Sequence, residues 1–289
     1  MSGQVLITGG SGFVGRAVLD RLIARGRAVR ALTRSEESAA VLSAAGAEPV
    51  RGDLGDPGSL ERAMAGCEVV YHVAGLNGFC LPDPGALTVA NVEGTRAVVR
   101  AAGAAGVRRV VYTAAGAAPG ERTGTIGSES SIHRGGFLSH YERSKFEAER
   151  VAFATAAGLG VELVSVNPSS VQGPGRTRGT AKILIDALNG RLKLIVDSRM
   201  SIIDIGDCAE GHLLAEERGE AGERYVLSGV TLTVAEAVAL LGRISGRDGP
   251  PRRPPPPVAA GRASRAALPR PARPRPASPR LRSGSRPPS

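Results

Sequence analysis

A glycine-rich segment near the start of the chain constrains the fold more than any other feature. Val5–Thr8 is a short, mostly β-branched apolar run that predicts a buried strand. Gly9, Gly12 and Gly15 follow at three-residue spacing, and residues 13–25 have the apolar periodicity of a helix. In such a unit the glycines allow a tight turn, close approach of the backbone to a phosphate and close packing of helix on strand. The segment therefore predicts a pyrophosphate site; a tight turn without a ligand is the alternative.

The end of the next predicted strand, residues 28–33, bears on which dinucleotide binds. An acidic residue at this point would hydrogen-bond a ribose 2′-hydroxyl, whereas an arginine suits a 2′-phosphate. Arg34 and Ser35 stand there, which favours NADP(H). Glu36 and Glu37 follow directly and keep NAD(H) as the alternative, and a solvated Arg34 without a ligand is the other interpretation.

A second motif, Tyr141 and Lys145, lies about 130 residues downstream. Residues four apart on a helix share a face, so a helix over 141–157 would bring both side chains into one pocket. A nearby ammonium favours the phenolate and lowers the pKa of a tyrosine from its usual value of about 10. Such a tyrosine can exchange a proton with a carbonyl or hydroxyl group while a nicotinamide exchanges hydride.

The order of the remaining elements predicts the fold class. Strands expected at 5–8, 28–33, 69–73, 109–113 and 162–166 alternate with helices expected near 13–25, 59–65, 86–104 and 141–157. This alternation predicts an α/β, doubly wound parallel sheet. We divide the chain into a dinucleotide-binding domain (1–166), a smaller and incomplete substrate lobe (167–248) with helices near 179–190 and 234–243, and a tail (249–289).

The tail accounts for the strongly basic composition. Residues 249–289 hold ten Arg and 13 of the 20 Pro but no Lys, Asp or Glu, which leaves 27 basic and 27 acidic residues in 1–248. Because the tail has few apolar side chains, we expect it to be disordered. It also lacks the aromatic residues that would stack on nucleic-acid bases. We expect no specific nucleic-acid partner. The abrupt change at Arg247–Asp248 also suggests a shifted reading frame that replaces the native C-terminus, a hypothesis that resequencing would test.

At this point the chain resembles a known family, the extended short-chain dehydrogenases/reductases of the NAD-dependent epimerase/dehydratase type. Residues 4–247 are similar to its dihydroflavonol-reductase-like, 3β-hydroxysteroid-dehydrogenase-like and hopanoid-associated sugar-epimerase-like branch. Besides the two motifs above, the resemblance rests on Gly52-Asp53-Leu54, His72-Val73-Ala74-Gly75, Asn91-Val92-Glu93-Gly94-Thr95, residues 167–175 (Asn-Pro-Ser-Ser-Val-Gln-Gly-Pro-Gly) and residues 202–209 (Ile-Ile-Asp-Ile-Gly-Asp-Cys-Ala).

The resemblance implies an NAD(P)-binding Rossmann fold and a role for each matching residue. Tyr141 would be the acid/base, and Lys145 would bind the nicotinamide ribose and tune Tyr141. Asn91 would support a proton relay or, as we favour, the geometry of its helix. The implied cofactor-binding residues are Gly9, Gly12, Phe13, Val14, Gly15, Arg34, Asp53, Leu54, Ala74, Gly75, Lys145, Pro168 and Ser170.

One departure from the family concerns catalysis directly. Ala115 stands where the family has a serine or threonine whose hydroxyl donates to the reacting oxygen. Loss of one such donor costs on the order of 10²–10³ in rate in other enzymes. Thr113, two residues earlier on the same strand face, is an imperfect substitute, and the loop residues Ser128, Ser130, Ser131 and His133 are further candidates. Three interpretations of the protein remain, in order of preference: a slow enzyme, an enzyme whose hydroxyl donor lies elsewhere, and a noncatalytic cofactor binder.

We therefore expect an NADP(H)-preferring oxidoreductase that acts on a carbonyl or secondary alcohol. A nucleotide-sugar epimerase or dehydratase and a noncatalytic NADP-binding regulator are the alternatives. The expected partners are a small-molecule substrate and, as the resemblance implies, a second copy of the chain. The three cysteines are widely spaced, so neither a disulfide framework nor a metal site is predicted. Neither a signal peptide nor a membrane span is predicted, and the expected location is the cytoplasm.

Overall fold

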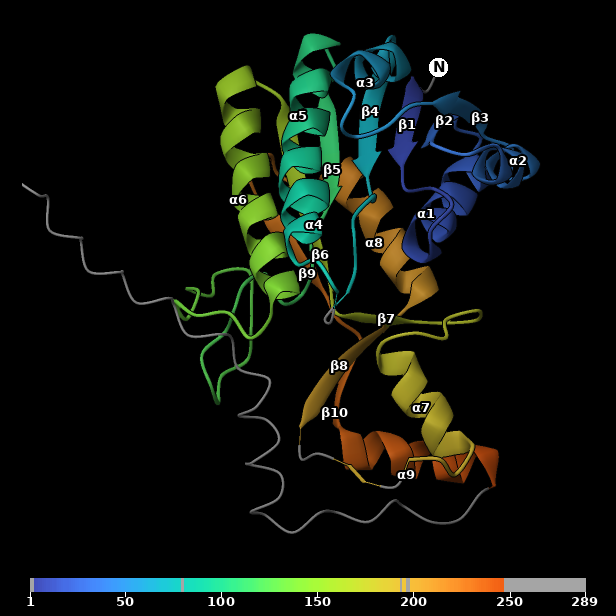
Figure 1. The fold of residues 1–289 in the computed structure, drawn as a ribbon, viewed down its shortest axis with the longest axis vertical. Helices are drawn as coiled ribbons and strands as arrows, with labels where there is room; N and C mark the ends of the chain where they lie inside the picture. The colour runs from blue at the N-terminus through green and yellow to red at the C-terminus, as the bar shows by residue number, and fades with distance from the viewer. Residues whose placement is uncertain (1–2, 79–80, 193, 196–197, 247–289) are drawn as a thin grey trace, which may run out of the picture. The chain divides into compact units, whose positions relative to one another are not determined.

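The computed structural model describes residues 3–78, 81–192, 194–195 and 198–246. Its main feature is a parallel sheet of seven strands in the order β3-β2-β1-β4-β5-β6-β9 (Figure 1). The strands are β1 (Gln4–Thr8), β2 (Val29–Thr33), β3 (Glu48–Arg51), β4 (Cys67–His72), β5 (Arg109–Thr113), β6 (Glu162–Pro168) and β9 (Arg224–Leu227). The predicted doubly wound parallel sheet is confirmed. The order reverses between β1 and β4, and in such sheets a crevice for ligands opens there at the carboxyl ends.

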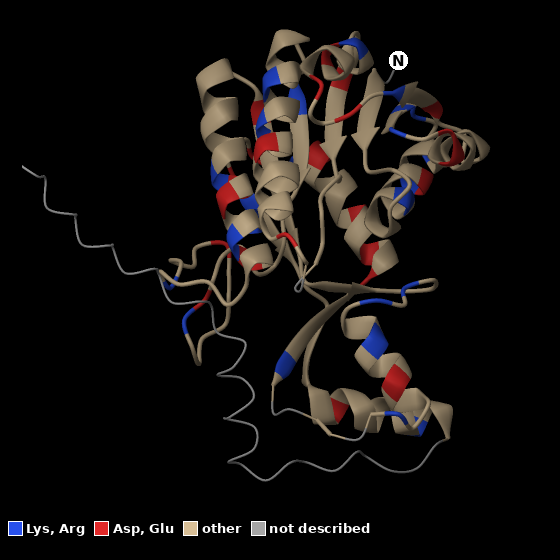
Figure 2. Ribbon diagram, in the orientation of Figure 1, with Lys and Arg blue, Asp and Glu red and all other residues tan. Residues whose placement is uncertain are grey.

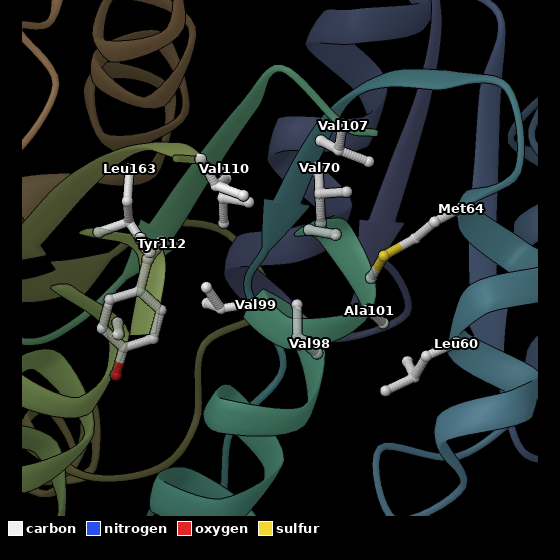
Figure 3. Packing of buried hydrophobic residues seen from close by; sticks show 14 of the residues in the cluster. Leu60, Met64, Val70, Val98, Val99, Ala101, Val107, Val110, Tyr112 and Leu163 are labelled. Atoms are coloured by element: carbon white, nitrogen blue, oxygen red, sulfur yellow. The ribbon is translucent and has the colours of Figure 1, made fainter. Parts of the chain in front are cut away.

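Helices cover both faces of this sheet, which explains why its strands are apolar on both sides. The helices are α1 (Phe13–Ala24), α2 (Glu36–Ala44), α3 (Pro57–Met64), α5 (Gly94–Ala104), α6 (His140–Leu159) and α8 (Ile205–Arg218). Side chains alternate along β5: Val110 and Tyr112 pack with α3, α5 and α6, while Val111 packs with α1, α2 and α8. Figure 3 shows Val98 and Val99 of α5 in the first of these two cores.

The long helix predicted over residues 86–104 is interrupted. It consists of a short turn α4 (Gly85–Leu87), a π-helical segment η1 (Thr88–Glu93) and then α5. Segments of this kind are often found at functional sites, and periodicity analysis does not detect them because only one turn is widened. Here the buried Asn91 lies within the π-helical segment.

A second, smaller sheet follows β6. It contains β7 (Ser170–Gln172), β8 (Arg199–Asp204) and β10 (Val230–Thr233), with β8 between the other two. The helices α7 (Thr180–Leu188) and α9 (Val234–Ser245) lie against each other beside it (Figure 1). A capping box begins α9, since Thr233 and Glu236 bond each other's backbone N–H groups. Between β8 and β10 the chain returns to the large sheet through α8 and β9.

Two expectations about the surface can be compared with the described residues. No helix in the ranges given above is long and apolar enough to cross a membrane. Figure 2 shows residues of both signs interspersed along α1 and α6, in keeping with the balanced charge of residues 1–248. The tail 249–289 and Cys80 lie outside the described residues.

The glycine turn generates a prediction about stability. A Cβ at Gly15 would collide with the carbonyl oxygen of Gly9, whereas Gly158, an exposed helical glycine of α6, has no neighbouring atom within 4 Å of its Cβ position. We expect Gly15→Ala to lower the free energy of unfolding by about 1–3 kcal/mol through backbone displacement. Gly158→Ala should raise it by roughly 0.5–1 kcal/mol. Urea denaturation measures both, and equal effects of the two substitutions would contradict this account of the turn.

Candidate functional site

The turn between β1 and α1 is packed tightly against the end of β4. Gly9 has φ +73°, and a Cβ there would lie 2.6 Å from the backbone nitrogen of Ala74. The N–H of Gly12 donates to the carbonyl oxygen of Gly9 at 2.9 Å. Only glycine fits these close approaches, and Ala74 is held next to the turn by a bond from its N–H to Thr8 Oγ1 at 3.2 Å. The turn and the end of β4 therefore border the place at the carboxyl ends of the strands where sheets of this kind bind ligands, which we call the groove.

The first turn of α1 has the properties of an anion site. Its N-cap, Gly12, makes no side-chain cap, and the first turn contains no acidic residue. The first backbone N–H groups of a helix carry a partial positive charge and accept an anion such as a phosphate. Phe13 and Val14 open this helix, so the residues present fit the pyrophosphate of a dinucleotide.

The far end of the groove holds Arg34 and Asp53. The Arg34 side chain is 81% exposed, and its Nη1 lies 3.6 Å from Asp53 Oδ2. Ser35 caps α2 by accepting from the N–H of Ser38 at 3.2 Å. Leu54 is partly buried against the core. The structure thus places Arg34 and Asp53 side by side, and the carboxylate partly offsets the charge that was expected to bind a 2′-phosphate.

Tyr141 and Lys145 lie one turn apart near the start of α6, as predicted. Ser139 caps this helix by accepting from the N–H of Glu142 at 3.0 Å. Lys145 is buried, donates from Nζ to the carbonyl oxygen of Thr113 at 2.8 Å and lies 5.2 Å from the centre of the Tyr112 ring. Burial lowers the pKa of Lys145 to about 8, and the negative charge of Glu149 counteracts this change.

The expected lowering of the pKa of Tyr141 is wrong for this structure. Burial disfavours the phenolate and raises the pKa to about 12, with Arg176 as the cation that opposes the change. The ammonium of Lys145 is instead directed to the Thr113 carbonyl at the end of β5. Arg176 carries no sequence signal for such a role, because it lies in the irregular segment after β7. There its guanidinium packs on Phe13, 5.2 Å from the ring centre.

Asn91 joins three parts of the site. Its Oδ1 accepts from the N–H of Leu76 at 2.7 Å, and its Nδ2 donates to the carbonyl oxygen of Leu76 and to Ser144 Oγ, both at 3.0 Å. Gly75 lies beside this network, since a Cβ there would be 3.7 Å from Lys145 Nζ. Asn91 therefore holds the segment after β4 against α6, which is a structural role.

The two buried histidines belong to the packing. His72 bonds Thr8 Oγ1 at 2.8 Å and Thr95 Oγ1 at 3.0 Å, and burial lowers its pKa to about 3. His212 Nε2 lies 3.0 Å from Thr113 Oγ1, and burial lowers the pKa of His212 to about 4. The hydroxyl of Thr113 is thus bonded on the side of α8, whereas Lys145 reaches β5 from α6. We conclude that Thr113 does not replace the hydroxyl missing at Ala115.

The loop candidates for that hydroxyl are also engaged. Ser128 Oγ lies 3.2 Å from Ser130 Oγ and 3.4 Å from Ser131 Oγ. His133 stacks on Phe146 of α6, with 4.3 Å between ring centres. Arg134 forms a partly buried ion pair with Glu142. These contacts tie the loop 116–139 to the first half of α6.

The residues after β6 complete the site. The N–H of Gly116 donates to the carbonyl oxygen of Pro168 at 2.7 Å, which places this segment directly beside the residue that follows Ala115. Ser170 Oγ accepts from Gln172 Nε2 at 2.9 Å. Ser169 Oγ is buried and has no hydrogen-bond partner among the described residues. Ser169 carries no sequence signal beyond its place in a motif, because the burial of its hydroxyl depends on how the chain folds around it.

The predicted site residues thus lie just beyond or at the carboxyl ends of β1, β2, β3, β4 and β6, at the start of α1 and at the start of α6, and Ala115 follows β5. The family model of the NAD dependent epimerase/dehydratase family matches residues 5–228.

Individual relatives include reductases. The chain is 36% identical over 230 residues to a 4-hydroxy-2-methyl-3-oxo-4-farnesyl-3,4-dihydroquinoline-1-oxide ketoreductase from Stigmatella aurantiaca, covering 78% of this chain and 68% of the relative. It is 34% identical over 259 residues to cinnamoyl-CoA reductase 1 from Oryza sativa subsp. japonica, covering 82% and 74%. Among solved structures, the dTDP-glucose 4,6-dehydratase DesIV double mutant from Streptomyces venezuelae with NAD and DAU bound superposes with a TM-score of 0.76 at 25% identity, covering 86% and 83%. The chain belongs to the NAD-dependent epimerase/dehydratase family.

Proposed function

We propose that this protein is an NADP(H)-preferring oxidoreductase that interconverts a carbonyl group and a secondary alcohol. The observation that carries the proposal is the buried Lys145 ammonium, bonded to the Thr113 carbonyl, on the same helix face as Tyr141 and beside Gly75 of the groove. Two relatives at 36% and 34% identity are named as a ketoreductase and a CoA reductase.

The protonation state of Tyr141 favours the reductive direction. With its pKa raised to about 12, the phenol carries its proton near neutral pH and can donate it to a carbonyl oxygen. A bound nicotinamide would supply the hydride that adds to the carbonyl carbon. Donation leaves a phenolate, which the neighbouring cation Arg176 stabilises until solvent returns the proton.

Cofactor choice rests on Arg34. An exposed guanidinium at the end of β2 matches a 2′-phosphate, and the nearby N-terminus of α2 adds to the positive potential. Asp53, 3.6 Å from Arg34, weakens the preference without reversing it. The NAD bound in the DesIV structure supports the alternative of an NAD-dependent epimerase or dehydratase, whose reaction begins by oxidation and so calls for a tyrosinate.

The assignment of Tyr141 can be tested by removing one atom. Tyr141→Phe should leave NADPH affinity within about twofold and lower kcat by on the order of 10²–10⁴, because it deletes the proton donor alone. Loss of nicotinamide absorbance with a panel of ketones and aldehydes measures the rate, and calorimetry measures the affinity. Tyr225→Phe, the same change on β9, is the control and should have little effect on the rate. Unchanged turnover in Tyr141→Phe would refute the proposed role.

Restoring the missing hydroxyl tests whether catalysis is impaired. Ala115→Ser should raise kcat/KM by on the order of 10²-fold, because it adds a donor to the reacting oxygen. Ser169→Ala in the wild-type background should then change the rate little. No gain in Ala115→Ser together with a loss in Ser169→Ala would overturn this prediction and identify Ser169 as a relocated donor.

A further inference from the structure

A carboxylate with no part in the proton transfer lies one helical turn beyond Lys145. Glu149 is fully buried on α6. Its Oε1 accepts from Ser165 Oγ and from Asn167 Nδ2, both at 2.8 Å, and its Oε2 lies 3.3 Å from Nη1 of Arg224. Burial of a carboxylate is costly unless it is paired and hydrogen-bonded, so a side chain held in this way calls for an explanation.

One connection runs from Glu149 to the backbone next to the reacting groups. The amide of Asn167 that donates to Glu149 also donates to the carbonyl oxygen of Ala115 at 3.2 Å. Asn167 accepts in turn from Ser165 Oγ at 3.0 Å. Glu149 therefore fixes the orientation of the amide that holds position 115, where the family places the substrate-polarising hydroxyl.

A second connection is electrostatic and reaches Lys145. The titratable groups around this lysine are His72 from β4, Tyr112 from β5, and Tyr141 and Glu149 from α6, with Arg224 of β9 paired to Glu149. His72 is neutral near pH 7 because its pKa is about 3, and the pKa values of both tyrosines are raised by burial. Among these groups of the described chain, Glu149 is the anion that opposes the effect of burial on Lys145.

From this arrangement we propose that Glu149 is a positioning residue of the active site, whose buried carboxylate keeps Lys145 in its ammonium form and, through Asn167, holds the backbone at Ala115. The proposal rests on the proposed function, since Glu149 would act only through the Tyr141–Lys145 pair that the proposed function requires. Arg224 makes burial of the carboxylate tolerable, because it provides the compensating charge from the edge strand.

The chain offers an unusually direct measurement, because it contains only three lysines, Lys145, Lys182 and Lys193. The full-length protein is labelled with ¹³C at the lysine ε-carbon, and its NMR signals are titrated with pH; the signal missing in Lys145→Arg identifies Lys145. In Glu149→Gln the midpoint of Lys145 should fall by about 1 pH unit, because loss of the negative charge disfavours the ammonium. Glu147→Gln, the same change at a more exposed position of α6 bonded to Arg143, should leave it unchanged.

The activity profile provides the matching functional readout. If turnover requires protonated Lys145, the alkaline limb of kcat/KM should move to lower pH in Glu149→Gln by the same amount as the NMR midpoint. Glu149→Asp keeps the charge and should restore most of the wild-type midpoint. If thermal melting shows that Glu149→Gln is unfolded, Glu149→Met takes its place, because it also removes the charge and the partly exposed Arg224 can turn to water. An unchanged Lys145 midpoint in the folded variant overturns the proposal. Because the titration needs no substrate, its outcome is independent of whether Tyr141→Phe confirms the proposed reaction.

Discussion

The bond between the Lys145 ammonium and the Thr113 carbonyl is the interaction on which the site depends. It joins α6 to the carboxyl end of β5 inside a buried environment, and so fixes the helix face that carries Tyr141. The carbonyl dipole partly replaces the water that a buried ammonium loses. The Asn91 network joins the same helix to the segment that follows β4, and the Glu149 network joins it to the end of β6. The reacting groups are therefore held by contacts at or beyond the ends of three strands.

The second constraint is steric and concerns the groove. Gly9 must approach Ala74, and Gly15 must approach Gly9, before β1, α1 and β4 can close to this distance. The same close approach leaves the first turn of α1 uncapped and available to an anion. A packing requirement of the fold and a binding requirement of the cofactor are thus met by the same glycines, so a substitution there affects both stability and affinity.

The sequence predicted the fold well where the physical signal is local. The apolar runs of β1 and β5, the glycine spacing and the Tyr141–Lys145 spacing each depend on a few adjacent residues, and their elements were predicted to within a few residues. The π-helical turn at Asn91 was missed because it widens only one turn and so leaves the apolar periodicity almost unchanged. The bond of Thr113 to His212 and the pairing of Glu149 with Asn167 and Arg224 were missed because each depends on partners far apart in sequence. The pKa of Tyr141 was predicted in the wrong direction for the same reason: spacing indicated a nearby ammonium, but not the extent of burial or the carbonyl that the ammonium binds.

Calorimetric titration of the purified full-length protein with NADPH and with NADH tests the central claim most directly, namely that the groove at the carboxyl ends of the strands binds NADP(H) next to Tyr141. The account predicts that both bind and that NADPH binds at least about tenfold more tightly, a difference of roughly 1.4 kcal/mol, because Arg34 meets the 2′-phosphate. Tighter binding of NADH would contradict the role given to Arg34 and favour the epimerase or dehydratase alternative. Failure of both cofactors to bind would contradict the site itself, and with it the catalytic roles of Tyr141 and Lys145.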